Sequence, residues 1–201
     1  MDTSTTTALL LIDVQRGETM PGEYGIPHMS GGAERHARIR AVLGACRKAG
    51  VPSVFIQEVH KRSLIDFGRE LDGHEGVHCL EGEPATELAD GLVPEEHEYL
   101  IRKRRYSAFF ATELELVLRA YGVNTLLLVG SLTDVCVHYT FADAHQRDFH
   151  CRVLTDCVGG SSLEAHDAAL RAMAYLQRDC LTTSEQILEQ LAAAQPMQLA
   201  V

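Results

Sequence analysis

The sequence predicts an α/β protein built on a single doubly wound, mostly parallel six-stranded sheet with helices on both faces. Apolar segments of strand length alternate along the chain with segments whose apolar residues recur at helical spacing. The first apolar segment, residues 8–12, is continuous rather than alternating, which is typical of a central parallel strand covered on both sides. The length predicts one domain, residues 1–201.

The first half of the chain contains two predicted strands, one helix and a long irregular segment. The helix places apolar residues at positions i, i+3, i+4 and i+7 and ends at a glycine. The irregular segment is rich in glycine, histidine and acids and is too long for an ordinary connection, so we expect a functional loop at the active site. These elements are strands 8–13 and 51–57, helix 31–50, and loop 58–97 with a short helix at 84–91.

The second half repeats the strand–helix order with shorter connections. Two helices open with a capping box, in which a hydroxyl residue is followed three positions later by a glutamate: Thr112 with Glu115, and Ser161 with Glu164. The predicted strands are 98–102, 126–130, 152–155 and 180–182, and further helices cover 133–147 and 184–194. Ligands in such sheets bind at the carboxyl ends of the strands.

Charge balance and cysteine spacing narrow the class of protein. The chain has 18 basic and 28 acidic side chains, a net charge of −10, which disfavours nucleic acid and anionic lipid as partners. Its six cysteines have no spacing typical of a zinc or dithiol redox site, so we expect reduced thiols. The longest apolar run, residues 8–12, is too short to span a membrane. Residues 1–7 lack the basic start of a signal peptide, which predicts a cytoplasmic protein.

Three chemically active side chains follow predicted strands. Asp13 ends the first strand, Lys103 follows the third, and Cys136 lies just beyond the fourth. A carboxylate, an ammonium and a thiol at one crevice would supply a base, an electrostatic partner and a nucleophile. Taken singly, each has an ordinary structural interpretation: a turn former, a member of a solvated basic cluster, and a small buried hydrophobe.

Cys136 has the most favourable setting among the cysteines. If Thr133 or Asp134 caps the following helix, Cys136 lies in its first turn, where N–H groups and the helix dipole would lower the pKa of the thiol. Cys79, beside His78 in the loop, is a weaker competitor. The remaining cysteines have no comparable setting: Cys46, Cys151, Cys157 and Cys180.

At these residues the sequence resembles the isochorismatase-like cysteine hydrolases, which include nicotinamidases, N-carbamoylsarcosine amidases, and ureidoacrylate and biuret amidohydrolases. The resemblance rests on three blocks: LLLIDVQRG (9–17), IRKRRYSAFFATELE (101–115) and LLLVGSLTDVCVHYTFADA (126–144). It implies a catalytic triad of Asp13, Lys103 and Cys136, no cofactor, a small-molecule substrate, and a homodimer or homotetramer. Isochorismatases proper lack the cysteine, so its presence favours amide hydrolysis.

The resemblance also implies how the reaction proceeds. It places a cis peptide bond at Ser131–Leu132 and an oxyanion hole formed by the backbone N–H groups of Leu132 and Cys136. In the implied mechanism Asp13 takes the thiol proton, Lys103 stabilises the resulting charges, and the sulfur forms a thioester that water hydrolyses. One carboxylate then serves as base, acid and base again, which requires a pKa near the working pH.

Departures from relatives bear on metal and substrate. The nicotinamidase metal site uses an Asp-Trp-His run and a later histidine; here Glu58 and His60 occupy the first place, and no histidine follows at the second. We therefore expect a polar pocket rim and no metal, with His74, His78 and Cys79 as ordinary loop residues. DFGRELDG (66–73) and HCLEG (78–82) resemble the ureide-cleaving members, in which a late glutamine contacts the substrate, and Gln177 lies near that place.

Two functions of different classes remain. The first is a cysteine-dependent amidohydrolase acting on a small linear carbamoyl- or ureido-type amide (biuret-like), with a nicotinamidase-like hydrolase of another small amide as its alternative. The second is a non-catalytic oligomeric scaffold of the same fold. The complete set of Asp13, Lys103 and Cys136 favours the enzyme, since a scaffold has no need of the three together.

Overall fold

The chain forms one six-stranded sheet in which all strands are parallel. In the computed structural model, which describes residues 6–22 and 24–193, the strand order is β3-β2-β1-β4-β5-β6. The strands are β1 Thr7–Ile12, β2 Ser53–Glu58, β3 Tyr99–Lys103, β4 Thr125–Ser131, β5 His150–Gly159 and β6 Leu181–Thr182. This confirms the fold class predicted from the sequence.

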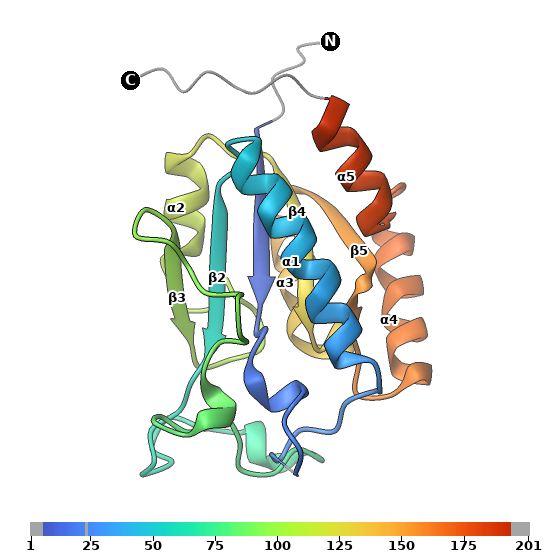
Figure 1. Cartoon of the computed structure of the whole chain (residues 1–201). Coiled ribbons are helices and arrows are strands. Elements are labelled where there is room, and N and C mark those ends of the chain that lie inside the picture. The colour runs from blue at the N-terminus through green and yellow to red at the C-terminus, as the bar shows by residue number, and fades with distance from the viewer. Residues whose placement is uncertain (1–5, 23, 194–201) are drawn as a thin grey trace.

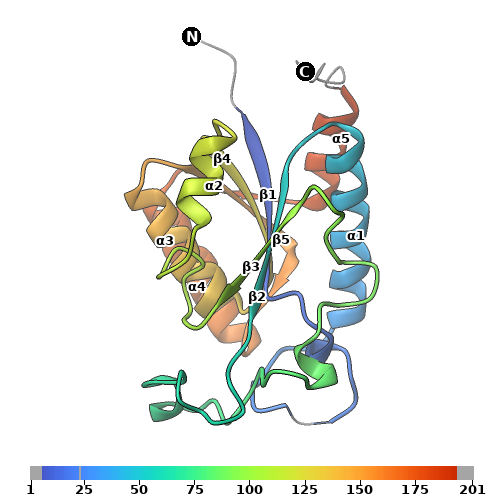
Figure 2. The same cartoon turned by 90° about the vertical axis from the view of Figure 1, so that its left-hand side faces the viewer.

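Helices cover both faces of the sheet, so the molecule has three layers (Figure 2). The helices are α1 Gly32–Lys48, α2 Leu114–Ala120, α3 His138–Gln146, α4 Leu163–Leu176 and α5 Ser184–Ala193. Helices α1 and α5 lie on one face, and α2, α3 and α4 lie on the other (Figure 2). Within the described residues, no helix is long and apolar enough to cross a membrane.

The continuous apolar run of β1 divides its side chains between two cores. Leu9 and Leu11 pack on the α1 side, whereas Leu10 and Ile12 pack on the side of α2, α3 and α4. All four are at most 1% exposed. The double coverage explains why this strand lacks polar residues, because both of its faces are removed from water.

β1 and β4 approach each other closely at the end that carries the site. At Gly130 the backbone has φ +115°, and a Cβ atom there would lie 1.9 Å from the Ile12 carbonyl oxygen. Glycine is therefore required at this position. The sheet grows from β1 to β3 in one direction and from β4 to β6 in the other, so the switch in direction falls between β1 and β4. The carboxyl ends of the strands meet the long loops at the lower end of Figure 1.

The predicted capping boxes are wrong in position. At α2 the residue before the helix is Glu113, which makes no capping hydrogen bond, while the Thr112 hydroxyl donates to the Ala108 carbonyl at 2.5 Å. At α4 the cap is Ser162, whose hydroxyl accepts from the Ala165 N–H. In both turns other local hydrogen bonds replace the predicted ones.

Two other predicted helices differ in form. The segment predicted at 133–147 begins with a π-helical turn, Thr133–Val137, before α3. Neither Thr133 nor Asp134 caps it: the Asp134 carboxylate instead accepts from the N–H and hydroxyl of Ser161, at 2.8 and 2.6 Å. The helix predicted at 84–91 is a single 3-10 turn, Pro84–Thr86.

Candidate active site

Four charged or nucleophilic side chains meet at the carboxyl ends of neighbouring strands. The parallel register of β2 and β3 sets Glu58 beside Lys103, and Asp13 follows β1 directly. Asp13 adopts φ +50°, a left-handed conformation that aspartate tolerates better than most residues. Cys136 comes from the π-helical turn after β4. The structure therefore brings together Asp13, Lys103 and Cys136, as the sequence predicts.

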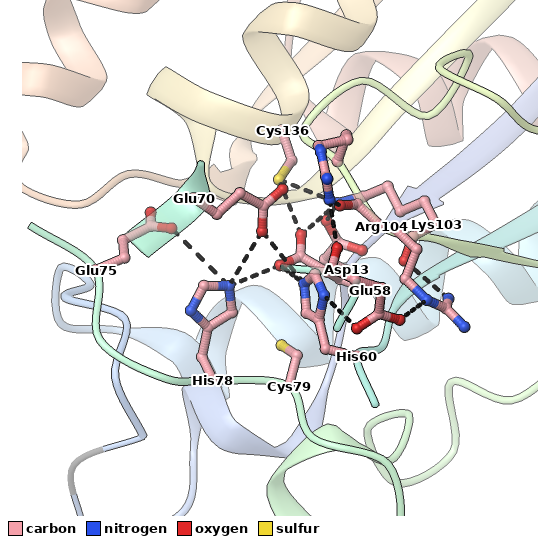
Figure 3. Close-up of polar contacts among 12 residues, drawn as sticks. Asp13, Glu58, His60, Glu70, Glu75, His78, Cys79, Lys103, Arg104 and Cys136 are labelled. Carbon is pink, nitrogen blue, oxygen red and sulfur yellow. Dashed lines mark hydrogen bonds and ion pairs between the residues drawn. The ribbon is translucent and has the colours of Figure 1, made fainter. Parts of the chain in front are cut away.

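The Lys103 ammonium is the centre of this group (Figure 3). Its Nζ lies 2.8 Å from Asp13 Oδ2, 2.5 Å from Glu58 Oε2 and 3.3 Å from Cys136 Sγ. The lysine side chain is fully buried. Glu58 is a fourth member that the sequence interpretation did not assign to the triad, and its Oε2 lies 3.6 Å from the sulfur.

The basic residues around Lys103 differ in burial and in the groups that they contact. β3 alternates, so Arg102 is exposed while Lys103 is buried. Arg104 Nε donates to Asp66 at 2.7 Å, and Arg105 donates to the backbone of the same residue. The arginines therefore hold the long loop, and only Lys103 enters the site.

The two carboxylates that share this ammonium have different proton affinities. Burial raises the pKa of Asp13 to about 6, although Lys103 lowers it. Burial acts on Glu58 as well, but Lys103 and hydrogen bonds from His60 and His78 hold its pKa well below the usual value. A proton added to this pair of carboxylates therefore binds Asp13 rather than Glu58. Asp13 is ionised above its pKa of about 6, which suits a group that must both take and return a proton near neutrality.

The expected pKa shift of Cys136 is wrong in direction. Burial raises the pKa of the thiol well above its usual value, and Asp13 and Glu58 add to this, while Lys103 opposes it. The helix terminus was expected to dominate, but a fully buried sulfur facing two carboxylates favours the neutral thiol. The resting thiol is therefore protonated, and it could act as a nucleophile only if a base removed its proton.

A cavity of about 180 Å³ opens onto the sulfur. Asp13, Glu58 and Cys136 line it, together with Ser131 and Leu132, whose connecting peptide bond is cis, as the resemblance implies. Apolar side chains form much of its wall: Tyr24, Ile26, Val77, Ala85, Tyr106 and Val135. The cavity can hold a small molecule with its carbonyl carbon against Cys136.

The expectation that Glu58 and His60 form a polar pocket rim is wrong for His60, which is fully buried and does not line the cavity, whereas Glu58 lines the cavity wall. They belong to a four-residue cluster completed by Glu70 and His78 from the long loop, and one ligand atom of each lies within 4.8 Å of the others. His60 Nε2 is 3.4 Å from Glu58 Oε1 and 3.2 Å from Glu70 Oε2. Only Glu58 of the four lines the cavity.

The donor set of this cluster fits a divalent cation. Both Glu70 oxygens are buried without a hydrogen-bond partner, although Oε2 faces His60. His78 Nδ1 donates to the Gly76 carbonyl at 2.7 Å, which directs Nε2 toward the carboxylates. Such a backbone contact is the usual way a metal-binding imidazole is oriented. Without a cation, hydrogen bonds to Glu58 and Glu70 outweigh burial and raise the pKa of His60 to about 9.

We expect the dialysed protein to bind one equivalent of Zn²⁺ or Mn²⁺ at Glu58, His60, Glu70 and His78. His78→Ala should abolish this binding, because it removes an inward-facing nitrogen from a buried set. The matched control, His74→Ala, changes an exposed histidine of the same loop and should bind as the unchanged chain does. Calorimetric titration measures both; equal affinity in the two variants would contradict this assignment.

A buried ion-pair network supports the neighbouring wall of the cavity. Glu18 accepts from Arg35 Nε and His36 Nε2, each at 2.9 Å, and from the Ser131 hydroxyl at 3.2 Å. Burial opposes the charge on Glu18, but these partners lower its pKa to about 2. The network joins α1 to the residue that precedes Leu132.

Glu18→Gln is expected to destabilise the protein by about 3 kcal/mol at neutral pH, from the lowered pKa of Glu18. Because the pKa is lower in the folded state, the stabilisation is complete above the unfolded value of 4.5 and is lost as pH falls toward about 2. Urea denaturation at pH 7 and pH 3 measures this. A difference between the two proteins that does not shrink at pH 3 would contradict it.

Gln177 does not lie at the catalytic cavity. Its amide bonds the backbone N–H and carbonyl of Cys151, at 2.9 and 2.7 Å, near the start of β5. Gln177 therefore binds the backbone near the amino-terminal end of β5, at the opposite end of the strands from the cavity. The expectation that His78 is an ordinary loop residue is wrong, because it is buried with its Nε2 2.8 Å from Glu58 Oε1. Glu70 reaches the same cluster from the irregular loop, whose path no sequence pattern predicts.

The chain was compared with known proteins. The Isochorismatase domain family matches residues 7–185. The ureidoacrylate amidohydrolase RutB of Methylobacterium radiotolerans is 32% identical over 186 residues, covering 82% of this chain and 72% of the relative. A probable inactive nicotinamidase of Arabidopsis thaliana, At3g16190, is 32% identical over 173 residues, covering 83% and 87%. The pyrazinamidase of Pyrococcus horikoshii in complex with zinc is 27% identical, with a TM-score of 0.76 and coverage of 89% and 98%.

Proposed function

Because the chain belongs to the isochorismatase-like cysteine hydrolase family, we propose that it is an amidohydrolase using Asp13, Lys103 and Cys136. Its substrate is a small linear amide of the carbamoyl or ureido type, cleaved at a C–N bond with release of ammonia. One observation carries the proposal: the Lys103 ammonium contacts both Asp13 and the Cys136 sulfur beside a small cavity.

The first half of the reaction forms a thioester. Asp13 accepts the thiol proton as the sulfur bonds to the carbonyl carbon, and Lys103 stabilises the negative charge that remains. The carbonyl oxygen gains charge and is stabilised by the backbone N–H groups of Leu132 and Cys136. Asp13 then donates its proton to the departing nitrogen, the C–N bond breaks, and ammonia leaves.

The second half restores the enzyme. Asp13 takes a proton from water, whose oxygen attacks the thioester carbon. The C–S bond breaks, and the proton returns from Asp13 to the sulfur. The same carboxylate thus alternates between base and acid, which suits the raised pKa of about 6.

The Glu58–His60–Glu70–His78 cluster would hold a divalent cation, and the similar pyrazinamidase is a complex with zinc. When bound, the cation supplies positive charge that compensates the Glu58 and Glu70 carboxylates. Lys103 then acts chiefly on Asp13 and Cys136, the groups that carry the proton transfer.

The substrate class follows from one relative and from the size of the cavity. A ureido substrate is supported by the likeness to an enzyme named for ureidoacrylate, and a biuret-like molecule suits a cavity of about 180 Å³. We further propose a homodimer or homotetramer in the cytoplasm, where the Cys136 thiol stays reduced. The alternatives are a nicotinamidase-like hydrolase, and a non-catalytic scaffold, which the relative named as inactive supports.

Release of ammonia tests the proposal. We expect the protein to release ammonia from at least one of biuret, triuret, ureidoacrylate, N-carbamoyl amino acids or nicotinamide. Asp13→Asn, which keeps the shape but cannot accept the proton, should remove this activity. If the unchanged protein releases ammonia from none of these compounds, or if Asp13→Asn releases it at the same rate, the amidohydrolase is rejected in favour of the non-catalytic scaffold.

The activity is expected to depend on pH in a defined direction. Asp13 must be ionised to accept the thiol proton, and its pKa is raised to about 6. The value of kcat/KM should therefore rise as pH increases through about 6 and fall on acidification. A pH profile of initial rates measures this, and a flat profile between pH 5 and 7, a range centred on that pKa, would contradict the role of Asp13.

A further inference from the structure

The charged side chains lining the catalytic cavity are acidic throughout the described part of the chain. They are Asp13, Glu18, Glu58, Glu75 and Glu83, and no lysine or arginine lines the cavity among the described residues. Lys103 is close by but fully buried behind Asp13 and Glu58. The exposed His28 is the one histidine among the described lining residues, so a substrate meets mainly carboxylates and apolar groups.

Most of these acids already have a cationic partner. Asp13 and Glu58 share Lys103, and Glu18 pairs with Arg35. Glu83 lies 3.7 Å from Arg62 at the surface. Each of these four acids therefore has a lysine or arginine beside it, and Asp13 and Glu58 share the same one.

Glu75 is the exception. Its nearest cationic partner is His78, with Nε2 4.0 Å away, and that nitrogen is already 2.8 Å from Glu58 (Figure 3). Only 19% of the Glu75 side chain is exposed.

The segment that carries Glu75 is held against the opposite wall of the cavity. The Gly76 N–H donates to the Gly25 carbonyl at 2.8 Å. Gly25 has φ +80°, and a Cβ atom there would lie 2.4 Å from the Val77 carbonyl oxygen, so the two segments are in close contact. Tyr24 and Val77, which flank this contact, line the cavity with Glu75. The carboxylate is thus placed in the wall by backbone packing.

We propose that Glu75 makes the cavity selective by charge: amides that are uncharged or cationic away from the reacting carbonyl bind, and amides that carry a carboxylate there are rejected. The Glu75 carboxylate accepts hydrogen bonds from N–H donors, which ureido and amino groups offer and a carboxylate lacks. A second carboxylate would instead face Glu75 in a cavity that has no lysine or arginine among its described lining residues. This inference rests on the proposed function, because it assumes that the amide enters this cavity.

Three ureas of matched length test it on the Cys136→Ser protein, which prevents turnover: N-carbamoylglycinamide is neutral, 2-aminoethylurea is cationic, and N-carbamoylglycine is anionic. We expect the anion to bind at least about tenfold more weakly than the neutral compound, from like-charge repulsion in a partly buried site. Glu75→Gln should reduce that ratio to about threefold or less, and Glu75→Lys should reverse the preference. Calorimetry or ligand-observed NMR gives the dissociation constants.

The control is Glu81→Gln, which removes the same charge from the same loop. Glu81 is exposed, pairs with Lys61 at 2.8 Å and does not line the cavity, so the ratio should stay unchanged. Equal binding of the anionic and neutral ureas, binding of none of the three, or equal effects of the two glutamine variants would overturn the proposal. Charge selection without ammonia release in the unaltered chain would instead reject the proposed function and leave the selectivity standing.

Discussion

Replacing Cys136 with serine is expected to lower the rate of amide hydrolysis by about a thousandfold or more, as loss of a nucleophile generally does. The structure makes this change more severe than the sequence alone indicates. The thiol is held neutral by burial and by two carboxylates, so its proton must pass to Asp13 during attack. A serine hydroxyl is a far weaker acid than a thiol, and Asp13 could not remove its proton efficiently.

The matched controls are the same substitution at Cys151 and Cys157. Both are fully buried in the cores, on opposite faces of the sheet, and neither lines the catalytic cavity. Ammonia release per folded molecule should change little in either variant. Circular dichroism establishes that the Cys136→Ser protein is folded; retention of more than a tenth of the original rate would remove Cys136 as the nucleophile.

Lys103→Ala is expected to abolish activity and to destabilise the protein by about 3–5 kcal/mol, the usual cost of removing one partner from a buried charge pair. The ammonium is fully buried among Asp13, Glu58 and the sulfur, and its removal leaves two carboxylates without their cation. Because Lys103 lowers the pKa of Cys136, its loss should also slow iodoacetamide labelling of that thiol. Lys103→Arg should fail too, since a planar guanidinium does not fit a site shaped for an ammonium.

Arg102→Ala is the control for Lys103. Its side chain is exposed on the same strand, so stability, labelling and turnover should stay close to those of the unchanged protein. Urea denaturation and peptide-resolved labelling compare the variants. If Lys103→Ala labels and turns over normally, the triad assignment is wrong.

The fold and the meeting of Asp13, Lys103 and Cys136 at one edge of the sheet could be predicted from strand patterns in the sequence, while their catalytic roles are what the family resemblance implies. A continuous apolar strand such as 8–12 has few alternatives to the centre of a covered parallel sheet. Parallel strands end at the same edge, so residues that follow different strands, such as Asp13 and Lys103, meet without long-range knowledge of the chain. In the structure, Lys103 Nζ lies 2.8 Å from Asp13 Oδ2.

The rest of the site depends on tertiary contacts. From the sequence, Glu58 is only a possible metal ligand. Its contact with Lys103 follows from the β2–β3 register, which the sequence does not show. Glu70 and His78 come from an irregular loop whose path no periodicity encodes. The direction of the Cys136 pKa shift was wrong because burial and neighbouring carboxylates outweigh the helix terminus.

The most direct test of the central claim compares alkylation of individual cysteines with loss of activity. Iodoacetamide is added to the enzyme in the presence and absence of substrate, and each thiol is followed by peptide mapping. The account predicts that ammonia release falls in proportion to the modification of Cys136, and that substrate slows both. Full modification of Cys136 with activity retained, or loss of activity with Cys136 unmodified, would contradict it.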